Sequence, residues 1–68
     1  MLSARNQLKG VVKSVKLGNI MAEVVVQVGD NEMVSVITRG SVERMGLKEG
    51  MPITVIVKAT EVMLATDA

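Results

Sequence analysis

The sequence predicts a small all-β domain with five short strands and one short helix between the third and the fourth strand. Three observations lead to this prediction. Apolar positions recur with a period of two, valine dominates the apolar residues, and Gly-Asn and Gly-Asp pairs separate the apolar runs. No linker or internal repeat interrupts the 68 residues, so we expect residues 1–68 to form a single domain.

The strands follow from the alternation of side chains. The clearest strand runs over Ala22–Val28, where every second residue is alanine or valine and glycine turns lie on both sides. Gly10 indicates a bend or a bulge within the first strand. Pro52 suits the first position of a strand, where its missing N–H group costs nothing. The other strands are expected at Leu8–Leu17, Met33–Thr38, Ile53–Ala59 and Glu61–Ala65.

The short helix is expected between residues 41 and 46. The Ser41 hydroxyl can cap its N-terminus, Glu43 falls in the first turn, where a carboxylate is favourable, and Gly46 fits the position after the last turn. Three strands, a helix and two further strands form the order of a small Greek-key barrel of the oligonucleotide/oligosaccharide-binding (OB) type. A small open sandwich is the competing interpretation.

The composition predicts an oligomer. The chain is 49% hydrophobic but has a mass of only 7.2 kDa, and it contains no cysteine that could form a disulfide. A chain of this size buries only about 60% of its unfolded surface when it folds alone. We therefore expect the apolar surplus to be buried against further copies of the chain.

The same composition argues against several function classes. Histidine, cysteine and all aromatic residues are missing, and the formal net charge is +1. These absences argue against an enzyme, against a site in which side chains ligate a metal cation, and against a nucleic-acid-binding domain. No apolar stretch is long enough to cross a membrane and no signal peptide is visible, so we expect a cytoplasmic protein without a membrane partner.

Two clusters of polar residues have the chemistry to hold a small dianion. Ser3 and Arg5 place a hydroxyl and a guanidinium just before the first apolar run, and Lys58 ends a strongly apolar strand. If Arg5 and Lys58 converge, their two charges offset those of a dianion. The plainer alternatives are a frayed N-terminus, a surface lysine at a strand end, and a Ser41 hydroxyl that only caps the helix.

Four segments together resemble a known family. They are SARNQLKG from residue 3, AEVVV from residue 22, SVERMGLKEG from residue 41 and VKATEVMLA from residue 57. This combination resembles the molbindins, or Mop proteins, which are free-standing members of the TOBE family of OB-like domains. The resemblance covers essentially the whole chain. It implies binding of molybdate, and often tungstate, for intracellular storage, buffering or homeostasis, with no cofactor.

The resemblance also implies an assembly and a set of site residues. Members of the family form hexamers, each a trimer of strand-exchanged dimers, and hold their ligands between subunits. Many relatives carry serine where this chain has Ala59, which offers only its backbone N–H group. The main oxyanion site is implied at Ser3, Ala4, Arg5, Ser41, Lys58, Ala59 and Thr60. A second site near the symmetry axes is expected at Asn6, Gln7 and Lys9. The alternatives are a nucleic-acid-binding OB-like domain and a purely structural assembly domain.

Overall fold

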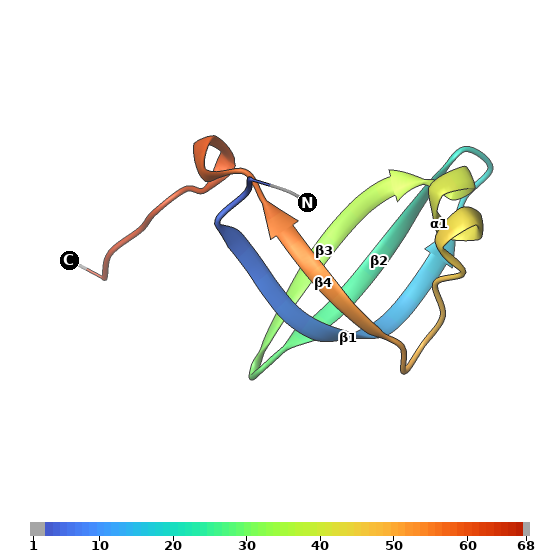
Figure 1. Cartoon of the computed structure of the whole chain (residues 1–68), viewed down its shortest axis with the longest axis horizontal. Helices are drawn as coiled ribbons and strands as arrows, with labels where there is room; N and C mark the ends of the chain where they lie inside the picture. The colour runs from blue at the N-terminus through green and yellow to red at the C-terminus, as the bar shows by residue number, and fades with distance from the viewer. Residues whose placement is uncertain (1–2, 68) are drawn as a thin grey trace.

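The computed structural model describes residues 3–67 of the chain. In this range it contains four strands, one α-helix and one 3₁₀ turn, in the order β1 (Asn6–Leu17), β2 (Met21–Val28), β3 (Asn31–Thr38), α1 (Arg39–Met45), β4 (Pro52–Val57) and the turn Ala59–Glu61. The strands form a single sheet in the order β3-β2-β1-β4, and all neighbours are antiparallel (Figure 1). The predicted all-β class is therefore confirmed at this level.

The long strand β1 organises the sheet. Its first half pairs with β4, from Asn6 opposite Val57 to Val11 opposite Pro52, and its second half pairs with β2. The register shifts at Lys13, between Val12 and Ser14, so the bulge lies three residues beyond the bend or bulge that the sequence predicts at Gly10.

Gly10 has a different role, because β1 passes close to β2 at this residue. A Cβ atom on Gly10 would lie 2.5 Å from the carbonyl oxygen of Gln27 and 2.8 Å from a methyl carbon of Val26. No side chain fits at that separation without a backbone shift. Glycine therefore permits the close crossing that curves the sheet in Figure 1.

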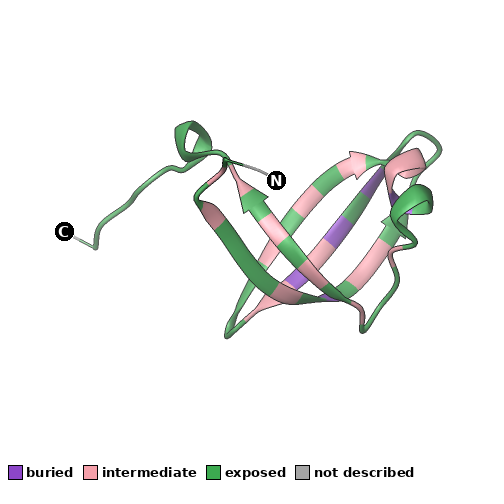
Figure 2. Cartoon of the chain, viewed as in Figure 1, coloured by how far each residue is buried: buried purple, intermediate pink, exposed green. Residues whose placement is uncertain are grey.

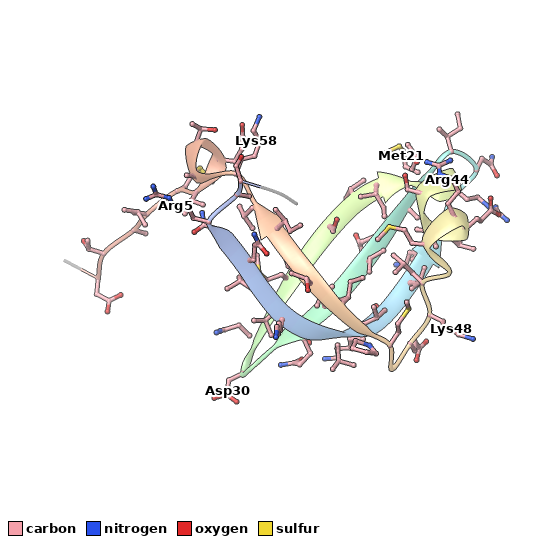
Figure 3. The ribbon with its side chains drawn as sticks, viewed as in Figure 1. Arg5, Met21, Asp30, Arg44, Lys48 and Lys58 are labelled. Atoms are coloured by element: carbon pink, nitrogen blue, oxygen red, sulfur yellow. The ribbon has the colours of Figure 1, made fainter. Side chains whose placement is uncertain are left out.

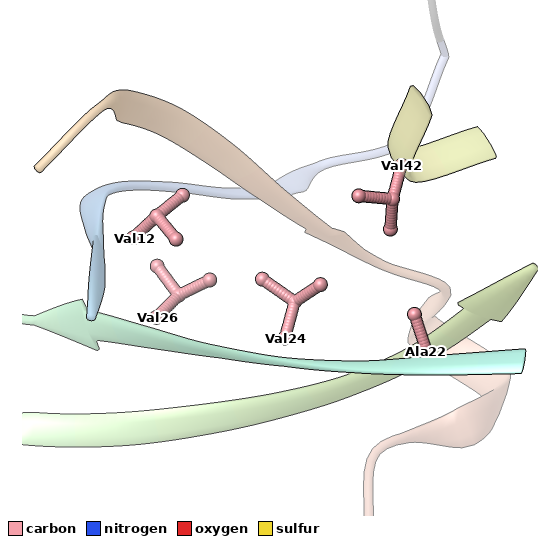
Figure 4. Packing of buried hydrophobic residues seen from close by; sticks show 5 residues of the cluster. All are labelled: Val12, Ala22, Val24, Val26 and Val42. Carbon is pink, nitrogen blue, oxygen red and sulfur yellow. The ribbon is translucent and has the colours of Figure 1, made fainter. Parts of the chain in front are cut away.

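The core is small and lies on the concave face of the sheet. Alternate residues of β2 supply most of it, as Figure 2 shows. Val42 of α1 packs against one end of this row, where the helix covers the sheet (Figure 4). The predicted alternation of β2 is confirmed, and its apolar face is the buried one. The buried hydrophobic residues in residues 3–67 are Val12, Ala22, Val24, Val26 and Val42.

The helix begins earlier than the sequence predicts. Its N-cap is Thr38, the last residue of β3, whose hydroxyl oxygen accepts a hydrogen bond from the Ser41 backbone N–H at 3.1 Å. Ser41 therefore lies inside the first turn, and the prediction that it is the cap is wrong. Thr38 takes the role because β3 runs directly into the helix and leaves Thr38 as the last extended residue. Gly46 is the C-cap with φ of 64°, as expected.

The predicted fifth strand at Glu61–Ala65 is not formed within this chain. β4 ends at Val57, residues 59–61 form the 3₁₀ turn, and residues 62–67 leave the sheet as an arm that points away from the domain (Figure 1). The reason is geometric, because the turn directs the arm away from both edges of its own sheet. Met63 and Leu64 are 92% and 93% exposed on this arm.

Within residues 3–67 the sheet is open rather than closed into a barrel. β3 pairs only with β2, and β4 pairs only with β1, so each has one free edge. Val34 and Val36 on the outer face of β3 are each 62% exposed. Apolar surface of this kind on a small protein indicates contact with another molecule.

The helices of the described range are too short and too polar to cross a membrane.

Candidate anion-binding site

The pairing of β1 with β4 brings Arg5 and Lys58 to the same end of the sheet. Asn6 lies opposite Val57 in the last pair of the ladder, so Arg5 directly precedes β1 and Lys58 directly follows β4 at this point. Figure 3 shows both at this end, with their side chains pointing in different directions. Both residues are exposed, and neither forms an ion pair within residues 3–67. Two cations therefore share one end of the domain without a bound carboxylate.

The segment before β1 is held in place by Gln7. The Gln7 side-chain amide donates a hydrogen bond to the carbonyl oxygen of Ala4 at 2.7 Å, and its backbone N–H donates to the Arg5 carbonyl at 3.2 Å. These bonds define the bend that presents Ser3, which is exposed, and Ala4, which is half-buried. The structure thus brings the Ser3–Arg5 segment to the same end as Lys58.

The 3₁₀ turn Ala59–Glu61 directly follows Lys58 and lies at the same end of the sheet as Arg5. The carbonyl of Lys58 accepts from the Glu61 N–H at 2.9 Å, and the carbonyl of Ala59 accepts from the Val62 N–H at 3.4 Å. Within residues 3–67, the hydrogen bonds of this end do not use the backbone N–H groups of Ala59 and Thr60. Both residues are exposed, so they can offer neutral donors beside the two cations.

Ser41 lies at the opposite end of the domain. Thr38, three residues before it, pairs with Met21 at the end of β1 that is remote from Arg5. The 12 residues of β1 separate the two ends, which corresponds to about 40 Å along the strand at the usual rise per strand residue. One chain therefore does not bring Ser41 together with Arg5 and Lys58.

Arg44 is a cation beside Ser41 that the sequence analysis missed. Its guanidinium donates to the Ser41 hydroxyl oxygen at 3.2 Å, and the Thr38 hydroxyl donates to the same oxygen at 2.8 Å. The spacing of three residues on a helix is the signal that could have revealed the contact. Figure 3 shows Arg44 on α1, far from Lys58.

The three residues expected to form a second site do not share one face in a single chain. Asn6 lines a concave hollow of about 390 Å³ together with Leu8, Val57 and other mostly apolar residues. Gln7 and Lys9 are separated by one residue and lie on the outer face, because successive strand residues alternate. In addition, the Gln7 amide is engaged with Ala4.

Within residues 3–67, the curved sheet carries at one end two cations without an ion pair and N–H groups without a hydrogen bond, and these are the properties of a small anion-binding β domain. A family model described as the TOBE domain matches residues 2–64, and the chain belongs to this family. It is 50% identical over 64 residues to molybdenum-pterin-binding protein 1 of Clostridium pasteurianum, a match that covers 93% of this chain and 94% of the relative.

Two solved structures are similar over nearly the whole fold. MopII from Clostridium pasteurianum superposes with a TM-score of 0.91 and 48% identity, covering 97% of this chain and 100% of the other. A molybdate-binding protein from Sporomusa ovata superposes with a TM-score of 0.92 and 36% identity, covering 97% and 98% of the two chains. These similarities support the resemblance to the Mop proteins that the sequence shows.

Proposed function

We propose that this chain binds molybdate, and also tungstate, as a free oxyanion for intracellular storage or buffering. The observation that carries the proposal is the presence of Arg5 and Lys58 at the same end of the sheet, where neither has a carboxylate partner within residues 3–67. The relatives named as a molybdenum-pterin-binding protein and a molybdate-binding protein support a molybdenum oxyanion as the ligand.

The chemistry of the residues explains how the anion is held. The planar guanidinium of Arg5 can donate two parallel hydrogen bonds to oxygens of a tetrahedral anion, and Lys58 adds a compact charge. Ser3, the backbone N–H groups of Ala4 and Ala59, and Thr60 then serve the remaining oxygens. The chain has no aromatic residue on which a pterin ring would stack, which favours the simple oxyanion over a pterin complex. Such a site binds and releases its ligand without catalysis or a cofactor.

The position of Ser41 requires that the complete site be shared between copies. Arg5 and Lys58 lie at one end of β1 and Ser41 at the other, so a ligand that contacts all three must lie between two chains. The exposed apolar residues of β3 and of the arm provide the contact surface. We expect a homohexamer arranged as a trimer of dimers.

Strand exchange would account for the missing fifth strand. The observed order β3-β2-β1-β4 is compatible with a Greek-key arrangement. The arm of one chain would add residues 61–65 as a fifth strand to the sheet of another chain and so complete an OB-like barrel. This arrangement would cover Met63 and Leu64, whose exposure in the single chain is otherwise unfavourable.

We further propose that residues 1–68 act as one domain in the cytoplasm, with no nucleic-acid or membrane partner. The absence of aromatic stacking residues and the near-neutral charge speak against the nucleic-acid alternative. Cell fractionation and a gel shift with single-stranded oligonucleotides test these two points.

Isothermal titration calorimetry with molybdate, tungstate and sulfate tests the function. The proposal predicts binding of molybdate and tungstate that is clearly tighter than binding of sulfate. Native mass spectrometry on the same samples should show six chains and bound anions. No heat with molybdate, or equal affinity for molybdate and sulfate, would contradict the proposal.

A further inference from the structure

The Ser41 hydroxyl is held by two donors from its own chain. Thr38 donates to the hydroxyl oxygen at 2.8 Å, and Arg44 donates to it at 3.2 Å. A hydroxyl offers two acceptor lone pairs and one proton, and a guanidinium can only donate. Because Arg44 fills one acceptor position and cannot accept a proton, the Ser41 proton is directed away from Arg44. This hydroxyl can therefore donate to a further acceptor.

Arg44 is the helix arginine that is free to take this position. The other one, Arg39, donates to the Gly18 carbonyl at 3.3 Å and pairs with Glu43 at 3.4 Å. Within residues 3–67, Arg44 has no ion pair. Its positive charge therefore stays uncompensated beside the Ser41 hydroxyl.

Gly40 provides independent support for this position of Arg44. A Cβ atom at Gly40 would lie 3.3 Å from the Nη1 atom of Arg44, closer than ordinary van der Waals contact. The guanidinium thus folds back over the first turn of α1 instead of extending into solvent. Glycine at this position leaves the space that the arginine occupies.

We propose that Arg44 is a positioning residue of the oxyanion site, which holds the Ser41 hydroxyl so that its proton points to the anion. This inference rests on the proposed function, in which Ser41 of one copy meets Arg5 and Lys58 of another. Arg44 also adds a third positive charge near the anion. Its main effect is transmitted through Ser41, and this sets it apart from Arg5 and Lys58.

Calorimetry with molybdate on the assembled protein tests the inference through a double-mutant cycle of Arg44→Met and Ser41→Ala. Arg44→Met should weaken binding by about three- to tenfold, since it removes one charge-assisted hydrogen bond that orients the donor. In the Ser41→Ala background the same change should weaken binding by less than about twofold, because coupled residues are not additive. Arg44→Lys, which keeps the charge and a donor, should restore part of the affinity.

The control is Arg39→Met, which removes the same charge from the same helix but leaves Ser41 untouched. Its affinity should stay within about twofold of the wild type, and native mass spectrometry should show the same assembly for every variant. If the wild-type protein binds no molybdate, the proposed function and the inference both fail. If it binds and Arg44→Met has wild-type affinity, or weakens binding equally with and without Ser41, the role of Arg44 is refuted while the proposed function stands.

Discussion

Replacement of Arg5 by alanine should weaken the binding of molybdate and leave the stability of the ligand-free fold nearly unchanged. Arg5 is exposed and forms no ion pair within residues 3–67, and its carbonyl, which accepts from Gln7, is retained in the variant. The free energy of unfolding of the ligand-free protein should therefore change by less than about 0.5 kcal/mol, as for most surface substitutions.

The loss of affinity follows from the hydrogen bonds of the guanidinium. A hydrogen bond to a charged group contributes about 1.5–3 kcal/mol, so the loss of one such bond raises the dissociation constant by roughly tenfold to a hundredfold. If the Arg5 fork binds two oxygens of the anion, the effect lies at or beyond the upper end of this range.

Calorimetry at constant ionic strength measures this change, with thermal unfolding of the ligand-free protein recorded in parallel. Lys48→Ala is the matched control, because Lys48 is an exposed cation on the loop before β4, away from Arg5 (Figure 3). It should keep the wild-type affinity. An Arg5→Ala protein that binds molybdate within threefold of the wild type would refute the role of this guanidinium.

Three further variants test the fold and the assembly. Leu64→Ser should weaken the oligomer by about 1.5–3 kcal/mol per arm if that side chain is buried in a partner, and sedimentation that shows an unchanged oligomer would contradict this. Gly10→Ala should destabilise the fold by about 1–3 kcal/mol through overpacking, read as a lower thermal midpoint. Gly40→Ala, whose Cβ would meet only a flexible arginine, is its control. Thr38→Val should cost about 1 kcal/mol as a lost cap, and an unchanged midpoint would argue against that role.

The local features that the sequence predicts correctly are those that depend on neighbouring residues. Ala22–Val28 alternates strictly, so its strand and its buried face follow from the pattern, and Gly46 ends the helix as predicted. The sequence predicts Ser41 as the cap because serine is a common capping residue. The structure selects Thr38, since the end of β3 places its hydroxyl within reach of the Ser41 N–H.

The features that the sequence alone misses depend on distant contacts. Residues 62–65 form a short apolar run that is typical of a strand, but whether they pair depends on which edge they reach, and the preceding turn directs them away from both free edges of their own sheet. The separation of Ser41 from Arg5 follows from strand pairing, because β4 pairs with the first half of β1 and β2 with the second half, and a residue pattern does not reveal this pairing. The contact of Arg44 with Ser41 depends on the space above Gly40.

A site shared between copies would couple the binding of the anion to the stability of the oligomer. If the anion binds only where two copies meet, it stabilises the oligomer relative to separate chains by mass action. The thermal midpoint should then rise with molybdate concentration, while a purely structural assembly domain would show no such dependence.

Subunit mixing tests the shared site most directly. Arg5→Ala chains and Ser41→Ala chains each assemble into oligomers in which every shared site lacks one group. After unfolding and joint refolding, about a quarter of the sites in a random mixture should regain both groups from two different chains. Calorimetry of the mixed oligomers should therefore recover a fraction of sites with wild-type affinity for molybdate. If the mixture binds no better than its two components, the site is not divided between copies in the way proposed.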